Sequence, residues 1–118
     1  MSQMIEAFFA AWGETDPALR AQSLRDALSP EVHYEDPRTS GAITRLDGVV
    51  DYVAMFTQYA PGASAHVVHL SETGGHFRAT VAFVMSDGQK QLGQYFIDLD
   101  DQSRPQRLIG FVGLGEPE

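Results

Sequence analysis

The sequence predicts an α+β fold, with helices packed on one face of an antiparallel sheet. Up to about residue 61 the apolar residues recur mainly at helical spacing, and from residue 63 onward they alternate with polar ones. Helices gathered in the first half of a chain and strands in the second are typical of this class. The 118 residues favour one domain, spanning 1–118, and are enough to bury a sizeable core.

Each predicted helix has its own start or stop signal. The first carries an apolar stripe and ends at Gly13. The second starts at Asp16-Pro17, because an Asp side chain can accept from the free N–H groups of a first turn and Pro is tolerated there. Asp47 is the predicted cap of the third. The expected helices cover 3–13, 17–28 and 48–60.

A short strand is expected before the third helix, and four meandering strands after it. Asp87-Gly88 lies between two apolar runs and predicts a tight hairpin, because both residues tolerate positive φ. One face of the predicted sheet is strongly apolar, while the other mixes polar residues with Ala82 and Phe96. A partly apolar outer face favours cover by a second subunit, so a homodimer through the sheet is predicted. The expected strands cover 32–35, 64–71, 76–86, 90–99 and 106–114.

Composition excludes several classes of function. The chain has no Cys, which excludes disulfides, a thiolate nucleophile and a sulfur-ligated zinc site. Its formal net charge of -8 disfavours nucleic acid and anionic membranes as partners. No apolar run is long enough to span a bilayer, and no secretory signal opens the chain. A soluble, cytoplasmic protein is therefore expected.

Several short motifs occur in a telling order: Trp12 closing the first helix, Asp16-Pro17, the run Val-His-Tyr-Glu-Asp-Pro at 32–37, and Leu-Asp-Gly at 46–48. Together they resemble the nuclear transport factor 2-like superfamily, which includes SnoaL-like polyketide cyclases and ketosteroid isomerases. The resemblance implies a cystatin-like curved antiparallel sheet wrapped around three N-terminal helices, a cone with an apolar cavity. Such domains commonly dimerise and carry many unrelated functions.

The resemblance implies that Asp36 is a general base, as in the Glu-Asp-Pro triplet of ketosteroid isomerases. Asp36 follows a short strand in phase with Tyr34, so its side chain could point into the cone. Apolar walls disfavour the charged form of a carboxylate and strengthen it as a base. The alternative is structural, since Asp before Pro often starts a turn and caps local N–H groups.

Ketosteroid isomerases complete their site with an oxyanion hole made of a Tyr and a protonated Asp. The position nearest that tyrosine holds Phe9 or Ala10 here, and the position nearest the second acid holds Tyr95. The phenol of Tyr95 could donate to an oxyanion in place of the acid. The alternative is that Tyr95 fills the core with its hydroxyl satisfied.

Aromatic and apolar residues at helical or strand spacing are candidate cavity walls, although such residues more often serve packing. The candidates for substrate binding are Trp12, Tyr34, Tyr52, Phe56, Phe77, Val81 and Phe83. No metal and no cofactor are expected. His66 and His69 are three apart, which on a regular strand places them on opposite faces. Gly110, Gly113 and Gly115 are expected to allow close approach or bending in the last strand, because no helix follows them to build a phosphate loop.

Two functions from different classes remain open at this point. The first is a small-molecule-binding, cofactor-free isomerase, cyclase or hydrolase for an apolar carbonyl or polyketide-like ligand, with Asp36 as base. The second is a non-catalytic ligand-binding or interaction module. An adaptor for protein transport is a weaker third option. Cavity size separates the first two, because usual ligand sites measure roughly 300–1,000 Å³.

Overall fold

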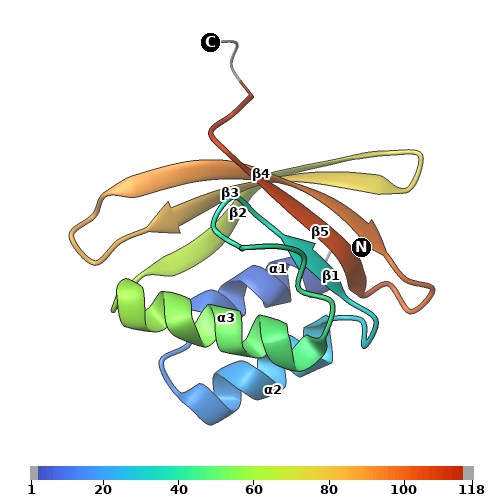
Figure 1. Ribbon diagram of the computed structural model, residues 1–118. Coiled ribbons are helices and arrows are strands. Elements are labelled where there is room, and N and C mark those ends of the chain that lie inside the picture. Colours follow the sequence, from blue (N-terminus) through green and yellow to red (C-terminus); the bar gives the residue numbers. More distant parts are fainter. Residues whose placement is uncertain (1–2, 116–118) are drawn as a thin grey trace.

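The structure, a computed structural model, describes residues 3–115, and within them it contains three α-helices, one 3₁₀ helix and a five-stranded sheet. All the helices lie on one face of the sheet, so the predicted α+β architecture is confirmed (Figure 1). None of these helices has the length and apolar character needed to cross a membrane. The elements are α1 (Gln3–Ala10), η1 (Ala11–Gly13), α2 (Pro17–Ala27), β1 (His33–Glu35), α3 (Leu46–Tyr59), β2 (Ser64–Thr73), β3 (His76–Val84), β4 (Lys90–Leu99) and β5 (Pro105–Val112).

One of the two predicted helix caps is confirmed and the other is wrong. Asp16 accepts from the backbone N–H groups of Ala18 and Leu19 at 2.9 and 3.1 Å, ahead of Pro17. The helix α3 starts two residues earlier than expected, so its cap is Arg45 and Asp47 lies inside the first turn.

Asp47 forms an ion pair with Arg25 instead of the predicted cap. Its carboxylate accepts from the Arg25 guanidinium of α2 at 2.6 Å, which leaves it no part in capping. The hydrogen bond and charge of Arg25 lower the pKa of Asp47. An acid in the first turn also faces the positive end of the helix dipole. Asp47 therefore links two helices at their exposed surface.

The sheet has the order β1-β5-β4-β3-β2 and is mixed rather than antiparallel. The strands β2 to β5 form the predicted antiparallel meander. β1 departs from the prediction because it pairs parallel to β5, with His33 opposite Arg107 and Glu35 opposite Ile109. Parallel pairing needs a long crossover connection, and here the intervening helix and three strands provide it.

The predicted alternation of faces holds in β3 and β4. Phe77, Val81 and Ile97 are buried against the helices, whereas Phe96 on the outer face remains exposed. The largest fully buried side chains come from both layers: Tyr34, Phe8, Phe9, Ile5, Leu24, Leu28, Ile97, Leu108, Val32, Val49, Val53 and Val81. The core therefore fills the space between the sheet and the three helices.

The expectation for the two histidines of β2 is wrong. A β-bulge interrupts the register between Val67 and His69. His66 consequently pairs with Ala82 and His69 with Thr80, two positions on the same outer face of β3. Within residues 3–115, however, no group of three or more His, Asp or Glu side chains could hold a metal ion.

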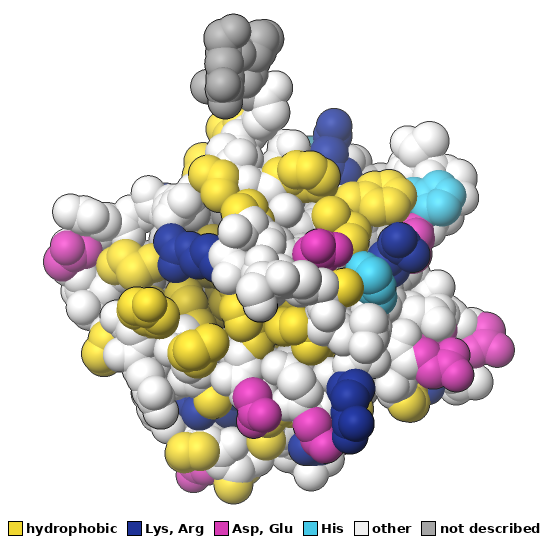
Figure 2. All heavy atoms as spheres, in the orientation of Figure 1, with side chains coloured by type: hydrophobic (Ala, Val, Ile, Leu, Met, Phe, Trp, Pro, Cys, Tyr) yellow, Lys and Arg dark blue, Asp and Glu magenta, His cyan; other side chains and the backbone are white. Residues whose placement is uncertain are grey.

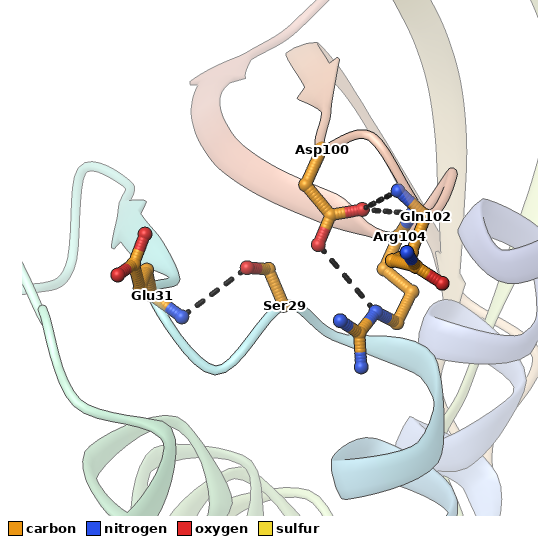
Figure 3. Close-up of polar contacts among 5 residues, drawn as sticks. All are labelled: Ser29, Glu31, Asp100, Gln102 and Arg104. Atoms are coloured by element: carbon orange, nitrogen blue, oxygen red, sulfur yellow. Dashed lines mark hydrogen bonds and ion pairs between the residues drawn. The ribbon is translucent and has the colours of Figure 1, made fainter.

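The turn between β4 and β5 is built on Asp100 (Figure 3). Its carboxylate accepts from the backbone N–H groups of Gln102 and Arg104, both at 2.9 Å, and lies 3.4 Å from the Arg104 side chain. Burial works to raise the pKa of Asp100, but these donors outweigh it and lower the pKa. The Ser29 N–H donates to the Pro105 carbonyl at 3.0 Å, which ties the segment before β1 to the start of β5.

Candidate functional site

A cavity of about 590 Å³ opens between the sheet and α3. Its walls are mainly apolar and aromatic, and its lining includes two charged side chains, Asp36 and Arg38. Hydrophobic side chains also collect on the surface between the sheet and α3, with Lys or Arg atoms at the edge of that area (Figure 2). The lining residues are Trp12, Asp36, Pro37, Arg38, Tyr52, Met55, Phe56, Tyr59, Phe83, Met85, Gln91, Leu92, Gly93, Tyr95, Gly110, Phe111 and Val112. The volume lies within the usual range for small-molecule sites.

Asp36 immediately follows β1 and serves as a local cap. Its Oδ1 accepts from the backbone N–H groups of Arg38 and Thr39 at 2.8 and 3.1 Å. This is the turn expected from Asp before Pro. The same carboxylate also lines the cavity. The structural and functional interpretations of Asp36 are therefore compatible, because the same carboxylate caps the turn and lines the cavity.

Two phenols complete the surroundings of Asp36. The Tyr34 hydroxyl donates to Oδ2 at 2.6 Å, and the Tyr52 hydroxyl lies 2.8 Å from both carboxylate oxygens. Tyr34 comes from β1 and Tyr52 from α3, so a strand and a helix hold the acid in place. Hydrogen bonds to a charged acceptor are stronger than neutral ones, so the carboxylate is fixed in position.

The hydroxyl of Tyr95 lies 2.7 Å from that of Tyr34. Each phenol has a single proton, and Tyr34 already gives its own to Asp36. Tyr95 must therefore donate to Tyr34, which directs a chain of protons from Tyr95 through Tyr34 to the carboxylate. In this resting arrangement the Tyr95 oxygen presents lone pairs, rather than its proton, to the cavity.

Burial keeps these three phenols neutral. Burial is the largest cause of the raised pKa of Tyr34, Tyr52 and Tyr95. The charge of Asp36 raises all three further, since a phenolate beside a carboxylate is repelled. The hydrogen bond that Tyr95 shares with Tyr34 lowers the pKa of Tyr95, but by less than burial raises it. All three side chains therefore hold their protons at neutral pH.

Gly110 on β5 has no side chain, which leaves space for the side chains of Tyr95 and Asp36. A Cβ atom at this position would lie 2.8 Å from Cε2 of Tyr95 and 3.1 Å from Cβ of Asp36. Both distances are shorter than ordinary carbon contacts, roughly 3.5–4.0 Å. The expected close approach at Gly110 is thereby confirmed, and it lies at the base of the candidate site.

Comparison with known proteins shows the fold. No family model and no curated protein matches the chain. Among solved structures, a protein of the SnoaL-like family from Agrobacterium tumefaciens aligns over 95% of this chain and 96% of its own, with a TM-score of 0.84 and 20% identity. A protein from Catenulispora acidiphila with a ketosteroid isomerase-like fold, in complex with trimethylamine, aligns over 95% and 86%, with a TM-score of 0.75 and 11% identity. The chain has the ketosteroid isomerase-like fold.

This ketosteroid isomerase-like fold is the one that the motif order implied, so the resemblance is confirmed at the level of architecture. An epoxide hydrolase from Mycobacterium tuberculosis shares it as well, with a TM-score of 0.69 and 16% identity over 95% of this chain and 81% of that one. One fold thus supports several chemistries, and function has to be argued from the site.

The fold brings most of the predicted site residues together. Asp36 and Tyr95 both line the cavity, joined through Tyr34. Four of the seven predicted wall residues also line it: Trp12, Tyr52, Phe56 and Phe83. The other three, Tyr34, Phe77 and Val81, lie in the core and outside the lining. Trp12 packs edge-on to Phe56 and Phe83, with ring centroids 5.0 and 5.5 Å apart.

Two features of the site were missed by the sequence interpretation. Tyr52 was predicted only as a wall, yet its hydroxyl is a donor to Asp36. Arg38 was not singled out, yet it lines the cavity. The spacing of Tyr34 and Asp36, two apart on one strand face, was a usable signal for a phenol beside the acid. No comparable local signal exists for Tyr52, which reaches the site from a separate helix.

Proposed function

We propose that this cavity is the active site of a cofactor-free enzyme that moves a proton on a small apolar carbonyl or polyketide-like compound. The observation that carries the proposal is the carboxylate of Asp36 at the cavity wall, joined to Tyr34 and Tyr95 by short hydrogen bonds. A carboxylate can remove a proton next to a carbonyl, and a neutral phenol can stabilise the oxyanion that results. Proteins with this fold include a member of the SnoaL-like family and an epoxide hydrolase, so the fold is compatible with an active site in this cavity.

The proton chain explains how base and donor can act in turn. Asp36 takes the proton from the carbon beside the carbonyl, and the carbonyl becomes an enolate. The protonated Asp36 keeps this proton and uses it to donate a hydrogen bond to the Tyr34 oxygen. The Tyr34 hydroxyl then rotates and donates its own hydrogen bond to Tyr95. Tyr95 is thereby free to donate to the enolate oxygen. Return of the proton to another carbon completes an isomerisation, and all protons are accounted for.

Deuterium exchange tests this proposal without a known substrate. The wild-type protein is incubated in D2O with a panel of unsaturated ketones and 1,3-dicarbonyl compounds, and mass spectrometry follows deuterium uptake. We expect Asp36→Asn to lower the catalysed exchange rate by at least about 100-fold, because the amide keeps the shape but cannot accept the proton. The matched control is Asp51→Asn, since Asp51 is exposed and does not line the cavity. An Asp36→Asn protein with full exchange activity contradicts the assignment of the base.

A non-catalytic binding module is the second candidate, and one observation favours it. Asp36 already accepts from two phenols and two backbone N–H groups, as a purely structural carboxylate would. In this case native mass spectrometry would detect a retained small molecule, while no panel compound would exchange deuterium. Binding without turnover would therefore favour the module over the enzyme.

We also propose that two copies of the chain associate through the outer face of the sheet. That face exposes Phe96 and Phe111, which are 42% and 60% accessible. Asp98 and Arg107 are opposite each other on neighbouring strands of the same face, so both signs of charge are present for a two-fold partner. Aromatic residues ringed by mixed charge are typical of such interfaces.

Sedimentation velocity tests the association. We expect the wild-type protein to sediment as a dimer and the double variant Phe96→Glu/Phe111→Glu as a monomer, because four buried carboxylates would face an apolar surface. Leu19→Glu on α2 is the control, since Leu19 is similarly exposed but lies on the opposite layer. A wild-type protein that remains monomeric at high concentration contradicts the proposal.

A further inference from the structure

The cavity contains one charge that its own residues satisfy and one that they do not. Among its lining residues in the described part of the chain, Asp36 and Arg38 are the ones with formally charged side chains. Asp36 is satisfied by the donors of Tyr34, Tyr52 and two backbone N–H groups, and one of these N–H groups belongs to Arg38 itself. Within residues 3–115 the guanidinium of Arg38 has no acidic side chain within ion-pair distance and donates no hydrogen bond.

The position of Arg38 places its charge at the polar end of the cavity. Arg38 follows Asp36 by two residues and is exposed at the opening. Its positive charge reaches the phenols inside, because it works against burial by lowering the pKa of both Tyr52 and Tyr95. A ligand that reaches Tyr95 therefore also lies within the field of the guanidinium.

The remaining walls accept an apolar body. Trp12, Phe56 and Phe83 surround the interior with rings, and Met55 adds a flexible thioether near the opening. An unpaired guanidinium beside such walls matches a carboxylate or another anionic group, which it can bind through two parallel N–H donors. The chain as a whole carries a net charge of -8, so an anion would be repelled without this local cation.

We infer that the ligand of this cavity is an apolar molecule with an anionic group, and that Arg38 binds that group at the opening. This inference rests on the proposed function only in assuming that the cavity takes a small molecule. The new elements are the anionic group of the ligand and the role of Arg38 in recognising it. Asp36 and Tyr95 then act on the uncharged part of the ligand, deeper in the cavity.

Two fluorescent probes that share one ring system separate charge from apolar fit. The first, 8-anilinonaphthalene-1-sulfonate, carries a sulfonate, and the second, N-phenyl-1-naphthylamine, does not. Trp12 is the single Trp of the chain and lines the cavity, so energy transfer from it reports that a probe is bound, and the Arg38 variants report whether the probe lies in the cavity. Dissociation constants are measured for the wild-type protein and for Arg38→Gln, Arg38→Lys and Arg45→Gln. Arg45 is the matched control, because it is exposed in the same segment and does not line the cavity.

We expect Arg38→Gln to weaken binding of the sulfonate probe about tenfold and that of the neutral probe less than twofold. Arg38→Lys should recover part of the loss, and Arg45→Gln should change neither constant. Equal weakening of both probes, or no change in either, overturns the role of Arg38 in binding an anion while leaving the cavity as a ligand site. Absence of energy transfer from Trp12 with both probes overturns the ligand site itself, and the inference with it. Thermal unfolding of each variant confirms that it is folded.

Discussion

Raising the pH from about 10 to 11 is expected to remove about 2 kcal/mol from the free energy of unfolding. In the unfolded chain Tyr34 and Tyr95 lose their protons near pH 10. In the folded chain they keep them, because burial raises the pKa of both. Unfolding thus releases up to two protons above pH 10, and the folded state loses stability as the pH rises. The stabilisation is complete below pH 10 and is lost as the pH rises towards the pKa values of the folded state.

Denaturant unfolding at pH 8, 10 and 11 measures this effect, with phenolate absorbance near 295 nm recorded in parallel. The chain contains one lysine, Lys90, so phenols dominate its alkaline titration. Tyr52 does not contribute to the expected loss in the free energy of unfolding, because its side chain is partly exposed. Tyr95→Phe should reduce the slope by about half. Full ionisation of these phenols before the circular dichroism changes would contradict the expected burial of the network.

Gly110→Ala is expected to lower the free energy of unfolding by about 2–3 kcal/mol and to disturb the site. The new methyl group would lie 2.8 Å from the Tyr95 ring and 3.1 Å from Asp36. Neither neighbour can retreat freely, because Tyr95 is buried and Asp36 is held by four donors. The hydrogen bond between Tyr95 and Tyr34 should lengthen, and deuterium exchange should slow with it.

The control for this substitution is Gly41→Ala, since a Cβ at Gly41 would meet nothing within 4 Å. Chemical denaturation of both variants gives the comparison, and we expect Gly41→Ala to stay within about 0.5 kcal/mol of wild type. A Gly110→Ala protein with unchanged stability and exchange rate would show that the sheet relaxes easily at this point. The close approach would then have no energetic role.

The sequence predicted those parts of the fold that depend on neighbouring residues. Asp16-Pro17 starts α2 as expected, and Asp87-Gly88 separates β3 from β4 as expected, because both signals act within a few residues. The parallel pairing of β1 with β5 escaped prediction, since its partners lie more than seventy residues apart. The bulge after Val67 escaped for a similar reason: it depends on how β3 lies against β2.

The candidate site was predicted in part, for the same physical reason. Asp36 stood out because its own neighbours, Tyr34 and the following proline, mark it. The donor role of Tyr52 depends on how α3 packs above β1, and the unpaired state of Arg38 depends on which acids lie near it in space. Tyr95 was identified, but the direction of its proton follows from the hydrogen bonds that join Tyr95, Tyr34 and Asp36 in space.

The parallel ladder between β1 and β5 has a consequence for the order of folding. It joins Tyr34 to Leu108, so the strand that positions Asp36 cannot be paired on a ribosome until β5 has emerged. Partly synthesised or frayed chains therefore lack the wall contributed by Gly110 and have no competent cavity. A molecule that occupies the cavity would bind only chains in which the sheet is complete. By mass action it would therefore favour the pairing of β1 with β5.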